Sequence, residues 1–257
     1  MSQYYRGKRG KNIFDPNSKE SFRLSRSKID RFFECPRCFY IDRRLGVDRP
    51  PGFPFNLNSA VDHLLKKEFD IHRAAQTKHP LMERYGLDAV PLKHPKMDEW
   101  RDALRGGVTY LHKPTNFLVT GGVDDIWVNP AGELLVVDYK ATSKDGEVSL
   151  DAEWQGGYKR QMEVYQWLLR RNDFEVSNTG YFVYANGQRD KKAFDGKLEF
   201  DVRLISYEGD DSWIENAIIA AHNCLMDDKL PSPGPDCDYC VYRNAALKVI
   251  PKQNKLF

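Results

Sequence analysis

The sequence predicts an α/β fold in which helices come first, a run of strands follows, and further helices and strands complete the core. Three observations indicate this order. Apolar residues recur at helical spacing toward both ends, short strand-like segments follow one another in the middle, and turn residues separate them. A chain of 257 residues can bury a substantial core around such elements.

The predicted elements follow directly from this spacing. Apolar periodicity predicts a helix near residues 25–35, which Pro36 disturbs, and a longer one over 59–75. Two glycines close a short helix at 96–105. The remaining predictions are strands at 107–113, 116–122, 123–128, 133–142, 179–185 and 198–206, and helices at 156–171 and 211–227. The sequence Asn129-Pro130-Ala131-Gly132 supplies a turn between two of these strands.

Charge is unevenly distributed along the chain. The net charge is +2, but residues 1–49 hold 13 Lys and Arg against 6 acidic residues, which makes this segment +7. A basic segment beside a more acidic body is suited to contact with phosphates, and a solvated arm explains the charge equally well. We expect residues 1–20 to form a flexible basic arm and residues 21–257 to form a single domain.

Acidic residues and a lysine interrupt two apolar strands in the segment 121–143. Asp138 and Lys140 are two residues apart, so they project from the same side of a strand, and the hairpin can bring Asp124 beside them. Two carboxylates and an ammonium in one cleft form a site for Mg²⁺ or Mn²⁺. A surface ion pair at a strand end is the alternative for this motif alone. Asp125 faces the opposite side of its strand and is left out of the site.

Two further groups of residues can join this site. His63 lies on the helix predicted upstream of the sheet, and a neutral imidazole can bind a metal. Gln161 and Tyr165 are four residues apart, hence on one helical face. Taken alone, each has a structural interpretation: a surface or core histidine, and an amphipathic boundary.

Four of the five cysteines form two CxxC pairs. Cys35 and Cys38 lie near the N-terminus, and Cys237 and Cys240 lie near the C-terminus. This pairing favours a metal site over disulfides, and a tetrahedral Cys₄ zinc site fits it. Cys224 is interpreted as a packed core thiol.

Four motifs follow one another along the chain: His63, Gly122-Val123-Asp124, Asp138-Tyr139-Lys140 and Gln161-x-x-x-Tyr165. Their order resembles that of the RecB-type branch of the PD-(D/E)xK nuclease superfamily, which includes the AddB nuclease domains and the CRISPR-associated RecB-like exonucleases. The resemblance extends over about residues 22–245. It implies a restriction-endonuclease-like core with a central mixed sheet flanked by helices, and terminal segments joined by a Cys₄ metal site.

The resemblance also implies roles for these residues. His63, Asp124, Asp138 and the Tyr139 carbonyl would bind the metal, Lys140 would be the catalytic lysine, and Gln161 with Tyr165 would support it. Ser59 stands where family members commonly have glycine. Several relatives carry a [4Fe-4S] cluster, which makes iron–sulfur the first expectation for the four cysteines and zinc the second. Relatives usually place one cysteine in front and three behind, whereas this chain offers two and two.

The resulting hypothesis is a metal-dependent deoxyribonuclease, an exonuclease on single-stranded or end-containing DNA, in repair, recombination or CRISPR- or phage-type processing. The alternatives are a non-catalytic nucleic-acid-binding or scaffold protein with the same fold, and a metal hydrolase with another substrate. No GxxxxGK[ST] motif is present, so DNA unwinding would need a helicase partner, and a CRISPR-type partner is also possible. No run of about 18 apolar residues and no signal-like N-terminus occurs, so we expect a cytoplasmic protein without membrane contact.

Overall fold

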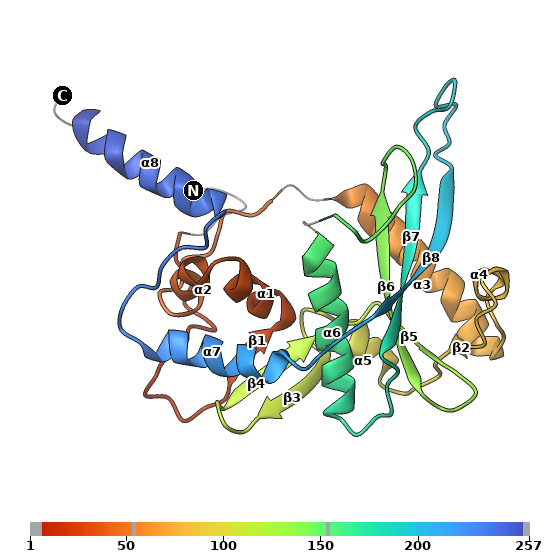
Figure 1. The fold of residues 1–257 in the computed structure, drawn as a ribbon, viewed down its shortest axis with the longest axis horizontal. Coiled ribbons are helices and arrows are strands. Elements are labelled where there is room, and N and C mark those ends of the chain that lie inside the picture. The colour runs from red at the N-terminus through yellow and green to blue at the C-terminus, as the bar shows by residue number, and fades with distance from the viewer. Residues whose placement is uncertain (1–6, 53–54, 153–154, 254–257) are drawn as a thin grey trace. The chain divides into compact units, whose positions relative to one another are not determined.

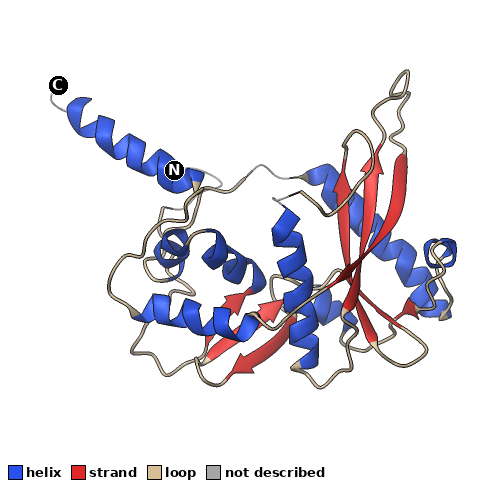
Figure 2. Ribbon diagram, viewed as in Figure 1, coloured by secondary structure: helices blue, strands red, loops and turns tan. Residues whose placement is uncertain are grey.

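The computed structural model describes residues 7–52, 55–152 and 155–253, and it has the mixed α/β architecture that the sequence predicts (Figures 1 and 2). Its chain divides into two compact units. The terminal unit comprises Met1–Phe53, Leu111–Val119 and Trp213–Phe257, and the sheet unit comprises Pro54–Tyr110 and Thr120–Ser212. The single domain predicted for 21–257 therefore stays a prediction. None of the helices in the described ranges has the length and apolar character needed to span a bilayer.

The sheet unit is built on five strands in the order β2-β5-β6-β7-β8. Pairing is antiparallel throughout except between β6 and β7, which are parallel and are connected through α6. The strands are β2 (Val90–Pro91), β5 (Asp125–Val128), β6 (Leu134–Thr142), β7 (Thr179–Gly187) and β8 (Phe200–Glu208). The helices are α3 (Asn56–Ala75), α4 (Pro80–Arg84), α5 (Met97–Arg101) and α6 (Gly156–Arg170).

Helices α3 and α6 lie against opposite faces of this sheet (Figure 1). On the α3 face, Phe69 stacks on Trp127 and Tyr139 at centroid distances of 5.2 and 5.6 Å. On the α6 face, Met162 packs so tightly on Gly180 that a β-carbon there would lie 2.4 Å from its sulfur. Side chains alternate along β6, so this strand contributes to both cores.

The turn between β5 and β6 forms as predicted. Gly132 has φ +87° and donates to the Asn129 carbonyl at 3.0 Å, and Asn129 donates to the Glu133 carbonyl at 3.1 Å. A positive φ carries no steric penalty for glycine, which explains the residue at this position. The turn sets the register in which Asp125 pairs with Val137.

The terminal unit combines helices with part of a second sheet of order β1-β4-β3. Its elements include β1 (Phe22–Ser25), α1 (Arg26–Glu34), α2 (Pro36–Arg43), α7 (Ile214–Met226) and α8 (Asp238–Gln253). Strands β3 (Val108–His112) and β4 (Phe117–Gly121) form a hairpin, of which residues 111–119 belong to this unit. Pro36 occupies the first turn of α2, where its missing N–H costs nothing. Within the predicted arm, Phe14 is buried, and residues 1–6 lie outside the described residues.

Candidate active site and cysteine centre

The central strand β6 carries the two residues that the sequence singles out first. Asp138 and Lys140 project from the face that α6 covers, and they form an ion pair. Both neighbours of β6 hold its backbone, with β7 pairing from Val137 to Thr142. The predicted common face is therefore confirmed, and the acid and the amine are fixed by a paired strand.

Asp124 lies where the β5–β6 ladder ends. The last paired residues are Asp125 and Val137, so the next amide of β6 on that side has no partner in β5. The Asp124 carboxylate takes this place, because its Oδ2 accepts a hydrogen bond from the Tyr139 N–H at 3.0 Å. The hairpin thus brings Asp124 beside Asp138, as predicted.

Asp138 is a buried acid with few polar or cationic groups around its carboxylate to offset its burial. Its side chain is fully buried, and among the described residues neither carboxylate oxygen accepts a hydrogen bond of normal geometry. Burial, opposed by Lys140 and assisted by the Asp124 charge, raises the pKa of Asp138 to about 7. A buried acid that is paired with one amine and lies beside a second carboxylate is suited to a divalent cation.

The predicted supporting pair lies beside Lys140. Its ammonium donates to Gln161 Oε1 at 3.3 Å, and Gln161 Nε2 donates to the Tyr165 hydroxyl at 2.9 Å. The same ammonium lies 4.4 Å from the centre of the Tyr158 ring, a cation–π contact. Gly121 leaves room for Tyr165, since a β-carbon there would lie 2.7 Å from that ring. The sequence did not single out Tyr158.

His63 is placed differently from the other predicted site residues. It is exposed on α3. Within the part of the chain that the structure describes, the four cysteines alone form a group of three or more potential ligands with atoms inside 4.8 Å. Neither His63 nor its neighbour Asp62 therefore forms a ready-made ligand group with Asp124 and Asp138 in this part of the chain. The role of His63 stays a prediction, as does that of the Tyr139 carbonyl.

Asp125 has the structural role that its strand face predicts. Its fully buried carboxylate forms ion pairs with Arg73 and Arg101 and accepts a hydrogen bond from the Tyr139 hydroxyl at 2.6 Å. These contacts lie on the side of β6 that α3 covers. Two adjacent acids, Asp124 just before β5 and Asp125 at its first residue, thus have different contacts.

Two residues of α3 near the site were missed in the sequence. Lys66 Nζ lies 2.9 Å from Asp62 Oδ2 and 3.2 Å from Asp124 Oδ1. Asp62 also lines a cavity of about 300 Å³, together with Lys140 and Tyr158. Their spacing of four residues on the face that carries buried Leu65 was the available signal.

The four cysteines converge in the terminal unit, as predicted. All are buried, reduced and within 4.8 Å of one another. The Sγ atoms of Cys38 and Cys237 are 3.5 Å apart, and Cys240 Sγ lies 3.7 Å from those of Cys35 and Cys38. Four thiolates around one zinc ion at about 2.3 Å would be separated by about 3.8 Å. The group could hold a metal ion or cluster.

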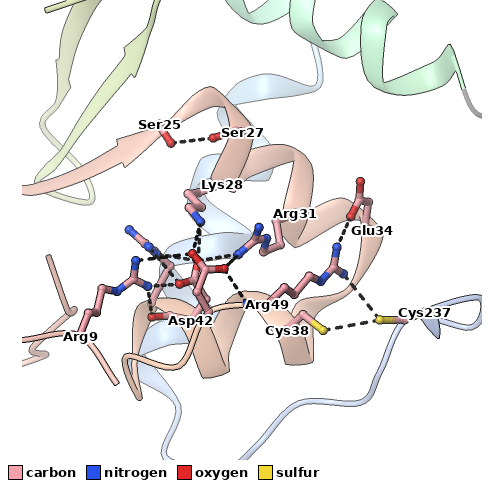
Figure 3. A network of polar contacts seen from close by, with 12 residues as sticks. Arg9, Ser25, Ser27, Lys28, Arg31, Glu34, Cys38, Asp42, Arg49 and Cys237 are labelled. Carbon is pink, nitrogen blue, oxygen red and sulfur yellow. Dashed lines mark hydrogen bonds and ion pairs between the residues drawn. The ribbon is translucent and has the colours of Figure 1, made fainter. Parts of the chain in front are cut away.

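Hydrogen bonds to sulfur stabilise this centre. Arg49 donates to Cys237 Sγ at 3.6 Å and to Glu34 at 2.7 Å (Figure 3). Burial opposes ionisation of Cys35, but N–H donors from Gly234 and Cys38 lower the pKa of this thiol to about 7. Thiolates are the metal-binding form, so these donors favour occupancy.

A buried ionic network lies beside the cysteines. Asp42 is fully buried and forms ion pairs with Arg9, Lys28, Arg31 and Arg43, as Figure 3 shows for the labelled members. Asp48 joins it through Lys28 at 3.1 Å and through Arg31. Much of the basic character of residues 1–49 is thus used internally.

Comparison with known proteins identifies the family of the chain. A family model of the PD-(D/E)XK nuclease superfamily matches residues 23–245. No match was found among curated proteins. Among solved structures, the chain is similar to one described as "Crystal structure of SSO0001", with 16% identity and a TM-score of 0.35, over 88% of this chain and 86% of the other.

Proposed function

Because the chain belongs to the PD-(D/E)XK nuclease superfamily, whose members are typically metal-dependent nucleases, we propose that it cleaves phosphodiester bonds in DNA. The observation that carries this proposal is Asp138, a fully buried acid that is ion-paired with Lys140 and lies beside the carboxylate of Asp124. Within the family we propose the RecB-like branch and exonuclease action on single strands or duplex ends. Repair, recombination, or CRISPR- or phage-type DNA processing is the proposed context, with a helicase or CRISPR-type protein as partner.

The residues present fit a hard divalent cation. Asp124 and Asp138 would hold Mg²⁺ or Mn²⁺, and the resemblance adds His63 and the Tyr139 carbonyl as further ligands. When bound, such an ion lowers the pKa of a coordinated water and neutralises charge on the scissile phosphate. The carboxylates hold their positions through the β6 backbone, so little reorganisation is needed at the moment of reaction.

The protein's own contribution centres on Lys140. Its ammonium is restrained by Gln161, by the Tyr158 ring and by Asp138. From this position it can donate to a phosphate oxygen where negative charge develops. Tyr165, through Gln161, fixes the amide orientation that keeps the amine in place.

The test uses labelled single- and double-stranded DNA with Mg²⁺, Mn²⁺ or EDTA. We expect metal-stimulated cleavage by the wild type, and a Lys140→Ala variant that binds DNA without cutting it. Lys144→Ala, an exposed lysine just beyond β6, is the matched control and should remain active. Wild-type binding without any metal-stimulated cleavage would support the non-catalytic scaffold alternative instead.

We propose that the cysteine centre is structural, because it joins Cys35 and Cys38 to residues about two hundred positions away within the terminal unit. The family resemblance favours a [4Fe-4S] cluster, and the sulfur spacing favours a single zinc ion. The visible spectrum and metal content of anaerobically purified protein decide between them. Absorption by a brown preparation identifies iron–sulfur, and a colourless protein with one zinc per chain identifies zinc.

A further inference from the structure

Helix α3 presents one polar face to the carboxylate site, and it does so through residues other than His63. We propose that Asp62 completes the divalent-cation site of Asp124 and Asp138, and that Lys66 occupies the cation position when no divalent metal is bound. This proposal rests on the proposed nuclease function and assigns the α3 ligand of its metal. It replaces the histidine ligand that the family resemblance implies.

Helical geometry separates Asp62 from its neighbour His63. Asp62 and Lys66 are four residues apart and share a face with the buried Leu65 and Phe69, which pack in the sheet core. His63 is turned by about 100° from Asp62 and is exposed, like the adjacent Leu64. Asp62 lies on the face of α3 that packs on the sheet, and Lys66 connects it to Asp124 at the end of the β5–β6 ladder.

The position of Lys66 identifies where a cation fits. Its ammonium lies 2.9 Å from Asp62 Oδ2 and 3.2 Å from Asp124 Oδ1, so it bridges carboxylates from a helix and a strand end. Burial opposes ionisation of Lys66, but the nearby Asp124 and Asp62 raise the pKa of its amine. An Mg²⁺ or Mn²⁺ ion also prefers carboxylate oxygens, at about 2.1 Å. Lys66 would have to leave this position, and the Asp62 and Asp124 carboxylates would have to draw together, for such an ion to bind.

Asp138 supplies an independent indication of a ligand. It is fully buried and its Oδ2 is ion-paired with Lys140, but within the described part of the chain its Oδ1 accepts no hydrogen bond. Asp124 is coupled electrostatically to it and bonded to Lys66. Three carboxylates against the two amines of Lys66 and Lys140 leave a net negative charge for a dication to neutralise.

Competition follows from this arrangement. A dication and the Lys66 ammonium need the same Asp124 oxygen, so removal of the amine should strengthen metal binding. An ordinary structural lysine would behave differently, because its loss would leave metal affinity unchanged or weaken it.

The experiment measures Mn²⁺ binding to the full chain without DNA, by electron paramagnetic resonance titration. We expect Asp62→Asn to weaken binding at least about 10-fold and Asp62→Glu to weaken it less, while the matched His63→Gln stays within about twofold. Lys66→Met should tighten binding by about threefold. Melting curves confirm that each variant is folded.

Each contrary result has a distinct meaning. Loss of binding in His63→Gln with no change in Asp62→Asn would restore the histidine ligand and overturn the proposal. Unchanged or weaker binding in Lys66→Met would overturn the role of the lysine as resident cation. The Asp138→Asn variant separates this inference from the proposed function. If its affinity for Mn²⁺ equals that of the wild type, the candidate active site itself is refuted.

Discussion

Asp42 in the terminal unit and Asp138 in the sheet unit are both fully buried aspartates, yet their surroundings differ. Asp42 meets four cationic side chains, whereas Asp138 has one amine and a second carboxylate beside it. A buried charge with several partners keeps its position without a ligand. A buried charge with too few partners needs a further cation, and this difference separates a structural acid from a functional one.

The cysteine centre tests the structural side of this comparison with the largest expected effect. Cys237→Ala should release the bound metal and lower the unfolding free energy by up to about 10 kcal/mol, because a structural metal contributes that much in small domains. Thermal melting with metal analysis measures both. Cys224→Ala, a half-buried thiol outside the centre, is the control. An unchanged melting curve with stoichiometric metal would contradict the structural role.

Asp42→Asn removes the acid on which four cations converge. Loss of one partner from a buried ionic network costs about 3–5 kcal/mol, since the remaining charges stay buried without compensation. Denaturant unfolding measures the change. Asp228→Asn, which breaks the exposed pair with Arg44, should cost at most about 1 kcal/mol. Equal effects of the two variants would mean that burial does not distinguish them.

Asp138→Asn should give the opposite result. We expect cleavage to fall by about 10²–10³-fold or more, because the site loses the acid that would hold the metal. Stability should stay the same or increase, since the substitution removes a poorly compensated buried charge. Cleavage rates and melting temperatures of the same preparation test this. Strong destabilisation would place Asp138 in the same class as Asp42.

Asp48 gives the smallest effect and a defined pH dependence. Burial opposes its ionisation, but Arg31 and Lys28 lower the pKa of this carboxyl to about 2. A lowered acid pKa adds stability above about pH 4 that is lost as the pH falls toward 2. Asp48→Asn should therefore cost about 1 kcal/mol at pH 7, because the half-exposed pairs are screened, and nothing near pH 2. A deficit that persists in acid would rule out this electrostatic origin.

The sheet was predictable from the sequence because alternation and turn chemistry are local properties. Strands β5 and β6 and their Gly132 turn formed as expected. Helix α8 was missed, since Asp238–Gln253 has little amphipathic pattern and contains Pro251. Pro36 was interpreted as a disturbance, but it begins α2, because a proline fits the first turn of a new helix.

The candidate site was predictable where strand periodicity determines the geometry. Asp124, Asp138 and Lys140 lie together because alternation along β6 and one hairpin place them there. The face that α3 turns to the sheet depends on tertiary packing, so the contacts of Lys66 with Asp62 and Asp124 were not predicted. The role of His63 stays a prediction. Partners such as Arg73 for Asp125 are distant in sequence, and local patterns cannot reveal them.

Because side chains alternate along β6, the same residue spacing determines which side chains reach the candidate site and which pack in the core. Insertion or deletion of one residue within the strand would turn Lys140 toward the hydrophobic core on the α3 side and Tyr139 toward α6. Strand β6 can therefore change by substitution, but a change in its length would disrupt both the candidate site and the core. In related sequences we expect insertions and deletions in the connections on either side of β6, and a constant number of residues within the strand.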